Sequence, residues 1–283
     1  MRVALVMTDA DFYAGTGFAE AWTRALEEHG ASVEGVAQVP PGWGMSGPPA
    51  YDLAVAHVLV EEVAAFAPTL AAATLLEACG VPLTNPVAAI VASADKLVTH
   101  AIWAAHGVPQ PATWALDELP EWPDGPLVLK PALCDGARHI ALVHSFEEAR
   151  AHVRAWREDE ARGGERRGTA LLQEWVPEPR CVRLFATPER TSLAYEKARQ
   201  PGALITHGTV YPRVYEPPVE MAALAQRMVE TLGGGLMGVD VLIAEDGRLL
   251  ALEANAPFGF DVTDPAQGEF VAAAALRRAR VAA

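Results

Sequence analysis

Three polar side chains near the C-terminus lie in a segment that otherwise suits two short buried strands. Residues 238–255 contain two apolar runs joined by Glu245-Asp246-Gly247-Arg248, which is typical of a turn. Side chains alternate between the faces of a strand, so Glu253 and Asn255 share a face, and the turn folds Asp240 back towards them. Two carboxylates and an amide are the hard oxygen ligands that Mg²⁺ prefers when it also carries phosphates. The pattern predicts a Mg²⁺ site, with Mn²⁺ as the alternative ion, or else a plain hairpin without a metal.

The composition is that of a folded globular protein and argues against a nucleic-acid-coating role. Of the 283 residues, 51% are hydrophobic and 20% are charged, and the formal net charge is −14. Binding along a phosphate backbone needs clustered Lys and Arg, which so acidic a chain does not supply. The basic run at 276–280 is interpreted as the solvated end of a helix, where cations suit the helix dipole. We therefore expect no nucleic-acid partner.

The apolar segments and the cysteines indicate neither secretion nor a membrane span. The apolar start Met1–Met7 runs directly into Thr8-Asp9 and is too short for a signal peptide. No stretch of 18 apolar residues occurs. Cys79, Cys134 and Cys181 lack Cys-x-x-Cys spacing, which favours reduced thiols over a disulfide frame or a zinc site. We expect a cytoplasmic protein with no membrane partner.

The first third of the chain alternates strand-like apolar runs with helix-like segments. Such alternation favours a parallel sheet covered by helices on both faces, so residues 1–88 are predicted to form a small α/β domain. The first strand ends at Thr8–Asp11, where such sheets place ligands. Neither a Gly-x-Gly-x-x-Gly fingerprint nor a Walker loop is present, so any nucleotide must be held by other means. The expected strands are 2–8, 33–37, 53–58 and 81–84, the expected helices are 18–29 and 61–79, and a loop is expected at 40–49.

Beyond residue 88 the pattern changes, and two further units are predicted at 89–168 and 169–283. The run 157–168 is highly charged and contains glycines, so we expect a mobile surface loop between these units. Helices are expected at 95–106, 145–157, 219–232 and 270–280, strands at 126–130, 140–143, 170–176, 182–186, 191–197 and in the hairpin, and a loop at 132–139.

Four motifs follow one another in these two units. They are Asp95-Lys96, Leu127-Val-Leu-Lys130-Pro131, Leu171-Leu-Gln-Glu174-Trp-Val176, and Asp240 followed by Glu253-Ala-Asn255. Each is weak alone, but their order and spacing resemble the ATP-grasp superfamily, especially RimK-like and LysX-like carboxylate–amine ligases. The resemblance covers nearly the whole chain. It implies an α/β fold of the α+β ATP-grasp type, in which a small N-terminal parallel α/β domain precedes two α+β subdomains that clasp ATP, with a flap at 132–139.

The resemblance gives phosphate-binding roles to two lysines. Lys96 and Lys130 match the lysines that reach the phosphates of ATP, and compact cations suit that role. The alternatives are a solvated helix residue for Lys96 and a strand-edge charge for Lys130. Because Lys130 ends an apolar run next to a loop, the binding role is favoured for it.

The third motif matches the hinge segment between the two subdomains. In the family the backbone of this segment hydrogen-bonds the adenine edge, so Gln173, Glu174 and Val176 are nucleotide-binding candidates. A nearby acid holds the ribose in the family, and Glu178 is the candidate here, with an exposed loop residue as the alternative.

Two departures from the family pattern concern the reacting phosphate. Arg183 matches an arginine that stabilises the transferred phosphate, but Cys181 stands where the Asp-x-Arg pattern has aspartate. Arg199 is the second candidate for a catalytic cation, with surface exposure as the alternative. The flap has the single glycine Gly136, which offers few backbone N–H groups to phosphates, so Arg138 or His139 is expected to take over part of that contact.

The reaction that the resemblance implies is amide formation driven by ATP. A carboxylate is phosphorylated to an acylphosphate with release of ADP, and an amine then displaces phosphate. Small-molecule carboxylates and amines are the implied substrates, an amino acid or small peptide-like molecule is favoured, and a peptide or carrier-protein acceptor and a homodimer or homotetramer are compatible. The alternatives are an ATP-dependent phosphotransferase on the same fold and a degenerate, non-catalytic nucleotide-binding protein.

Overall fold

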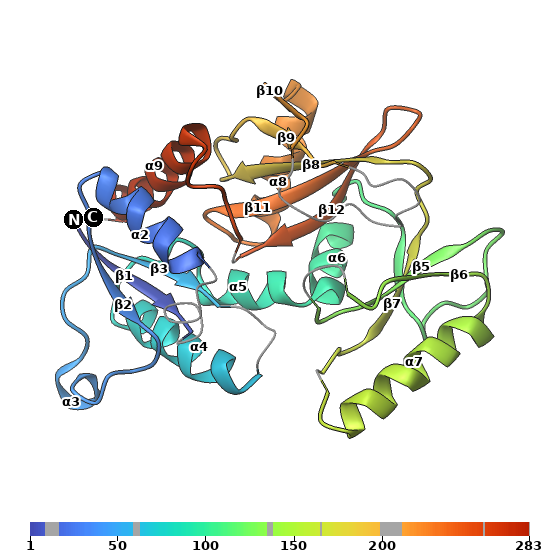
Figure 1. Ribbon diagram of the computed structural model, residues 1–283, viewed down its shortest axis with the longest axis horizontal. Helices are drawn as coiled ribbons and strands as arrows, with labels where there is room; N and C mark the ends of the chain where they lie inside the picture. Colours follow the sequence, from blue (N-terminus) through green and yellow to red (C-terminus); the bar gives the residue numbers. More distant parts are fainter. Residues whose placement is uncertain are drawn as a thin grey trace.

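The chain folds into three β-sheets with helices packed around and between them (Figure 1). The computed structural model describes residues 1–8, 17–58, 63–134, 138–164, 166–198, 211–256 and 258–282. Helices and strands are therefore mixed along the chain but grouped in space, as the predicted α/β and α+β architecture requires.

The first sheet is parallel, with strand order β2-β1-β3. Alternate residues of β1 face two different clusters. Val3, Leu5 and Met7 pack with helices α2 and α9, whereas Ala4 and Val6 pack with α4. A strand buried on both faces has to be apolar throughout, which is the pattern that predicted it. The elements are β1 (Arg2–Met7), α2 (Phe18–Glu28), β2 (Ser32–Val36), α3 (Trp43–Ser46), β3 (Leu53–His57), α4 (Val63–Ala78) and α9 (Pro265–Ala282).

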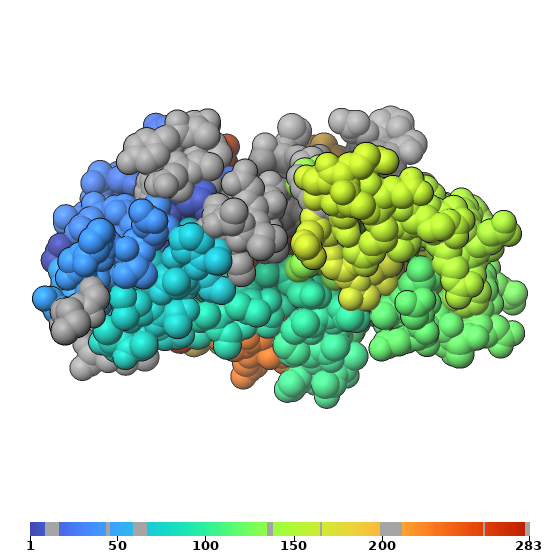
Figure 2. All heavy atoms as spheres, turned by 90° about the horizontal axis from the view of Figure 1, so that it is seen from below, coloured from blue at the N-terminus to red at the C-terminus, as the bar shows by residue number. Residues whose placement is uncertain are grey.

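The C-terminal helix α9 returns to the first sheet and packs beside α2, so the two ends of the chain lie together (Figure 1). Helices α5 (Val87–Ala94) and α6 (Lys96–Ala105) follow the first sheet and are bent by 106° relative to each other. In the space-filling view these two helices lie between the first unit and the part of the chain that carries α7 (Figure 2). The Asp95 carboxylate caps α6 by accepting hydrogen bonds from the backbone N–H groups of Leu97 and Val98.

The second sheet is antiparallel, with strand order β4-β7-β5-β6, and helix α7 covers one face. Ser145 caps α7, because its hydroxyl accepts a hydrogen bond from the backbone N–H of Glu148. The elements are β4 (Thr113–Ala115), β5 (Leu127–Pro131), β6 (Ala141–Val143), α7 (Phe146–Ala161) and β7 (Ala170–Glu174). Strand β7 completes this sheet although it lies beyond residue 168, where the predicted unit ends. The three domain ranges stay a prediction.

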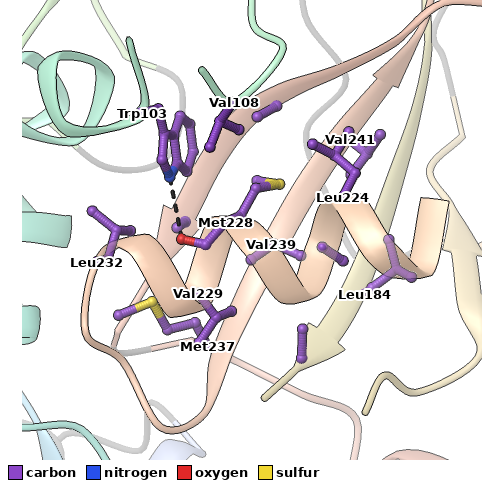
Figure 3. Close-up of a cluster of buried hydrophobic side chains, with 14 of the residues drawn as sticks. Trp103, Val108, Leu184, Leu224, Met228, Val229, Leu232, Met237, Val239 and Val241 are labelled. Carbon is purple, nitrogen blue, oxygen red and sulfur yellow. Dashed lines mark hydrogen bonds between the residues drawn. The ribbon is translucent and has the colours of Figure 1, made fainter. Parts of the chain in front are cut away.

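The third sheet is antiparallel, with strand order β10-β9-β8-β11-β12, and helix α8 covers one face. Figure 3 shows the core between α8 and this sheet. Trp103 of α6 is fully buried there and donates its indole N–H to the carbonyl of Met228 at 3.2 Å. This contact fixes α6, and with it Lys96, against the third sheet. The elements are β8 (Arg180–Ala186), β9 (Ala194–Glu196), β10 (Arg213–Tyr215), α8 (Val219–Thr231), β11 (Met237–Ile243) and β12 (Leu249–Asn255).

Several local expectations were wrong. The predicted loop 40–49 contains the short helix α3, and the predicted strand 81–84 makes only one bridge, between Ala54 and Leu83. The predicted mobile loop 157–168 is helical as far as Ala161, and Arg167 within it is buried. The charged composition of this segment therefore did not predict exposure of Arg167, because its guanidinium is paired with the carboxylate of Asp159. The prediction missed α5, β4 and β10.

Within the described residues no single helix is long and apolar enough to cross a membrane, and α5 and α6 reach that length and apolarity only as a bent pair. All three cysteines lie in the described part of the chain and none forms a disulfide.

Asn85 joins the first unit to the third sheet. Its side-chain oxygen accepts hydrogen bonds from the backbone N–H groups of Gly235 and Leu236, both at 2.9 Å, and its amide group donates to the carbonyl of Leu236 at 2.6 Å. The two segments approach so closely that a Cβ added to Gly235 would overlap the carbonyl oxygen of Thr84. A glycine is therefore needed at this joint.

We predict that Gly235→Ala lowers the free energy of unfolding by about 2 kcal/mol or more, since backbone must move to admit the methyl group. Gly268→Ala is the matched control, because nothing lies within 4 Å of the added Cβ and the position is inside α9. It should be neutral or slightly stabilising. Urea unfolding of both variants measures the difference, and equal stabilities would contradict the proposed close approach.

Candidate active site

The predicted hairpin brings the two carboxylates together. In the register of β11 and β12, Asp240 lies directly opposite Glu253, and Gly238 lies opposite Asn255. The register shifts between Asp240 and Val241, so a local irregularity follows the aspartate. The three predicted oxygen ligands therefore occupy neighbouring positions on one hairpin.

Asp240 is buried and is paired with two cations. It is 2% exposed. Its Oδ1 accepts from Arg183 Nε at 2.6 Å, and its Oδ2 accepts from Arg183 Nη2 at 2.8 Å and from Lys197 Nζ at 3.0 Å. Burial opposes ionisation, but the charges and hydrogen bonds of Arg183 and Lys197 outweigh it and hold the pKa of the Asp240 carboxyl far below its usual range.

The antiparallel pairing of β8 with β11 produces this ion pair. Arg183 lies directly opposite Asp240, so both side chains project on the same face of the sheet. Cys181, which replaces the aspartate of the family pattern, is buried in a small apolar cluster, and its carbonyl accepts from the backbone N–H of Lys197 at 2.9 Å. Arg183 is thus held by Asp240 of the neighbouring strand.

Glu253 is paired with the first lysine of the motifs. Its Oε1 lies 3.3 Å from Lys96 Nζ, and its side chain is 30% exposed. Burial raises the pKa of the Glu253 carboxyl, but Lys96, with help from Lys197 and Lys130, outweighs burial and the nearby Asp240, and the pKa is lowered. Lys96 also donates to the carbonyl of Cys134, which connects α6 to the start of the flap.

Lys130 is the most deeply buried cation of the site. It is 5% exposed, and its Nζ lies 3.0 Å from Gln173 Oε1 and 3.2 Å from His100 Nε2. Burial, with a further contribution from Lys96, lowers the pKa of Lys130 to about 7, against a smaller opposing effect of Glu253. No acidic side chain among the described residues forms an ion pair with it.

The hinge residues are positioned by β7 and the loop that follows. The backbone of Gln173 was expected at the adenine, and that stays a prediction. Its side chain is buried and bonded to Lys130 and, through Nε2, to Thr113 Oγ1 at 2.8 Å. Glu174 accepts from the backbone N–H of Ala112 at 3.2 Å, and Val176 is buried. Glu178 has a φ of 43°, in the left-handed region that few non-glycine residues adopt.

The flap is only partly described. Residues 135–137 and 199–210 lie outside the described part of the chain, so Gly136 and Arg199 cannot be placed. Cys134 Sγ lies 3.4 Å from the Arg138 carbonyl. Both ends of the flap rest on the segment before β7: Leu133 donates to the carbonyl of Arg167 at 3.0 Å, and Arg167 Nη2 lies 3.2 Å from His139 Nε2. The buried Arg167 therefore braces the base of the flap.

Sequence reasoning missed Lys197, which pairs with Asp240, and named Arg199 instead. A compositional pattern could have found it, since the chain has only three lysines, Lys96, Lys130 and Lys197, against nineteen arginines. All three lysines lie in this site. His100 was also missed, because a histidine inside a helix has no distinguishing neighbours in the sequence.

The comparisons with known proteins agree with this geometry. Residues 93–259 match the ATP-grasp domain family. The chain is 27% identical over 211 residues to a protein named probable alpha-L-glutamate ligase 2 from Hahella chejuensis, which covers 71% of this chain and 67% of that protein. It is 23% identical over 190 residues to the alpha-aminoadipate–LysW ligase LysX of Saccharolobus solfataricus, and this match covers 64% of this chain and 68% of that protein. Among solved structures, the ATP-grasp ligase PsnB, complexed with a minimal precursor, Mg and ADP, superposes with a TM-score of 0.69 at 15% identity and covers 98% of both chains.

The buried lysine predicts a pH dependence of stability. The pKa of Lys130 is lowered from 10.5 to about 7, so between these values the unfolded chain carries a proton that the folded protein does not. The free energy of unfolding therefore rises with pH across this window, and the gain is lost as the pH falls through about 7. Lys130→Met removes the group, so without nucleotide it should be more stable than the wild type near pH 6, by on the order of 4 kcal/mol at most, and lose that advantage near pH 10. Urea unfolding across this range tests it, and a difference independent of pH would contradict the burial of a titrating amine.

Proposed function

The chain belongs to the ATP-grasp domain family, and we propose that it is an ATP-dependent ligase that joins a carboxylate to an amine through an acylphosphate. Its similarity to proteins named as a glutamate ligase and as an aminoadipate–LysW ligase supports this reaction class. The family match spans the segment that contains all the paired cations and carboxylates described above.

One observation carries the proposal: the site holds more positive than negative charge, on side chains of which none is more than 30% exposed. With every group ionised, four cations minus two carboxylates leaves an excess of two positive charges. A triphosphate compensates such an excess, whereas a neutral ligand leaves it unpaired. The cations are Lys96, Lys130, Arg183 and Lys197, and the carboxylates are Asp240 and Glu253.

The nucleotide-binding roles follow from where these groups lie. We assign the phosphates to Lys96 and Lys130, which project from α6 and β5 next to the flap. Arg138 at the end of the flap is assigned to the same phosphates. The backbone of the hinge, at Gln173, Glu174 and Val176, is assigned to adenine.

The ribose is assigned to Glu178. Its left-handed backbone marks a tight turn directly after the hinge, and such conformations in non-glycine residues concentrate at binding sites. The Gln173 side chain accepts a hydrogen bond from Lys130, so only the backbone of Gln173 is assigned to adenine.

The donor set fits a divalent cation that is shared with phosphates. The carboxylates of Asp240 and Glu253 have lowered pKa values and are ionised at neutral pH, and the Asn255 amide lies on the same hairpin. No cluster of three or more His, Cys, Asp or Glu side chains occurs among the described residues, so the protein alone offers an incomplete ligand set. Mg²⁺ characteristically takes one or two carboxylates plus phosphate oxygens. Bound by these three residues, it would neutralise phosphate charge.

The chemistry follows from the charge distribution. The substrate carboxylate attacks the γ-phosphorus, ADP leaves, and an acylphosphate forms. The amine then attacks the acyl carbon, phosphate leaves, and the amine proton is released. The guanidinium of Arg183, held by two hydrogen bonds to Asp240, stabilises the negative charge on the transferred phosphoryl group, and Lys197 lies beside it. Arg199, two residues beyond Lys197, is the second candidate for this role.

The substrates are assigned by class. The two curated relatives are named as a glutamate ligase and as an aminoadipate–LysW ligase, and the PsnB structure holds a minimal precursor. We propose an amino acid or a small peptide-like molecule for this chain. Substrate pairs are identified by screening amino acids and carboxylates for ADP release that depends on both partners. Amide product that appears only with the amine distinguishes a ligase from a phosphotransferase.

Removing one carboxylate should abolish Mg²⁺-dependent turnover. Glu253→Gln is expected to lower substrate-dependent ADP formation by about a hundredfold or more, because charge stabilisation at the transferred phosphate is lost. Asp240→Asn should do the same but also lower the urea midpoint, since it weakens the partner of two buried cations. Asp246→Asn, on the exposed turn of the same hairpin, is the matched control. Normal turnover of Glu253→Gln would rule out the metal assignment.

Lys130→Ala should raise the dissociation constant of MgATP about tenfold or more, since it removes a buried cation that faces the phosphates. Isothermal calorimetry measures the constant, and Arg24→Ala, at an exposed ion pair on α2, serves as the control. An unchanged constant would leave Lys130 with a structural role only.

A further inference from the structure

We propose that His100 is a positioning residue that aims the ammonium group of Lys130 at the nucleotide, and that Gln110 holds the His100 ring in the required tautomer. The proposal rests on the phosphate-binding role assigned to Lys130 above. His100 lies on α6 and is 3% exposed, and its ring packs edge-on against Trp103 with centroids 5.5 Å apart.

The tautomer of His100 follows from its neighbours. Gln110 Nε2 donates to the backbone carbonyl of His100 at 2.9 Å, so the amide oxygen of Gln110 faces His100 Nδ1, at 2.6 Å. An oxygen that only accepts requires a proton on Nδ1. The other ring nitrogen faces two donors, Lys130 Nζ and Gln173 Nε2, each at 3.2 Å. His100 Nε2 is therefore the unprotonated acceptor.

The second partner of Lys130 is oriented by a similar argument. Gln173 Oε1 accepts from Lys130 Nζ at 3.0 Å, because an ammonium group can only donate. Its Nε2 then donates to Thr113 Oγ1 at 2.8 Å, and Thr113 donates to the carbonyl of Pro111 at 3.0 Å. Each donor in this series of hydrogen bonds faces an acceptor, and Lys130 Nζ and Gln173 Nε2 share His100 Nε2. The series therefore has a single donor-to-acceptor direction.

Two of the three ammonium protons of Lys130 are thereby assigned, and one remains. The fixed protons point to His100 on α6 and to Gln173 on β7, while the stem of Lys130 comes from β5. The third is the one available to a phosphate oxygen. His100 and Gln173 thus convert a flexible amine into a donor with a defined direction, which lowers the entropy that binding must remove.

His100 must be neutral for this role. Burial, together with the charges of Lys130 and Lys96, lowers the pKa of His100 to about 3, against a smaller opposing effect of its hydrogen bond with Gln110. The charged groups that act on the pair are Lys96 of α6 and Glu253 of β12. A neutral acceptor supports the ammonium form of Lys130 without adding a competing charge near the phosphates.

Binding of MgATP to the full-length protein tests the proposal. His100→Leu removes the acceptor and should raise the MgATP dissociation constant about tenfold, the size of one hydrogen bond to a charged group. His100→Gln places an amide oxygen near the position of Nε2 and should restore most of the affinity. His106→Leu, the same change at the exposed C-cap of α6, is the matched control, because among the described residues the His106 ring bonds only to the carbonyl of Ile102. Calorimetry on variants with a cooperative urea transition gives the constants.

A double-mutant cycle shows whether His100 acts through Lys130. In the Lys130→Ala background His100→Leu should have no further effect on the dissociation constant. Equal losses in both backgrounds, or a wild-type affinity of His100→Leu, would overturn the proposal. Failure of the wild type to bind MgATP would instead reject the proposed function, so the two outcomes are separate.

A spectroscopic measurement decides the question without nucleotide. Because the chain has three lysines, protein labelled with ¹³C-lysine gives three side-chain signals to assign, and the Lys130 signal is absent from Lys130→Ala. His100→Leu should move the titration midpoint of Lys130 to lower pH, since the ammonium form loses an acceptor. The ¹⁵N shifts of the wild-type His100 ring should show a protonated Nδ1 and a bare Nε2. An unchanged Lys130 midpoint, or the opposite tautomer, would contradict the assignment.

Discussion

The grouping of four cations and two carboxylates on largely shielded side chains in one site is the constraint on which the rest of the structure depends. A buried lysine loses its hydration, and for Lys130 this loss lowers the pKa to about 7. Two neutral partners, His100 and Gln173, hydrogen-bond its amine. The other cations are paired with carboxylates. The site is therefore electrostatically incomplete until a polyanion binds, which makes the same arrangement costly for folding and favourable for binding phosphates.

The architecture supplies each charge from a separate rigid element. Arg183 and Asp240 face each other because β8 and β11 pair in one register, and Glu253 follows from the pairing of β11 with β12. Lys96 begins a helix whose Trp103 is held in the core beside α8 by its hydrogen bond to Met228 (Figure 3). Because each group lies on a strand, at a helix end or, for Lys197, directly after a strand, little side-chain freedom remains to be lost when a ligand binds.

Departures from the family pattern are compensated by neighbours of different chemistry. Cys181 replaces an aspartate, yet the Arg183 guanidinium is held by Asp240 across the strands. The flap has a single glycine, but the buried Arg167 holds its base against α7 through Asp159 at 2.5 Å. The charged segment before β7, which suggested a mobile loop, is in part the brace for that flap. Local composition misjudged it, because an arginine with an acidic partner can be buried.

The sequence by itself determined the local features of the site. Strand alternation placed Glu253 and Asn255 on one face, the turn returned Asp240 to them, and four ordered motifs indicated the ATP-grasp fold that the family match then showed. These inferences depend on residues close in the chain, where the periodicity of a strand fixes direction. Only the tertiary structure decided that Lys197 pairs with Asp240, that β7 belongs to the second sheet, that α9 returns to α2, and that His100 and Gln173 meet Lys130. These contacts join residues tens to hundreds of positions apart, and no periodicity in a single sequence encodes which distant strand or helix will be the neighbour.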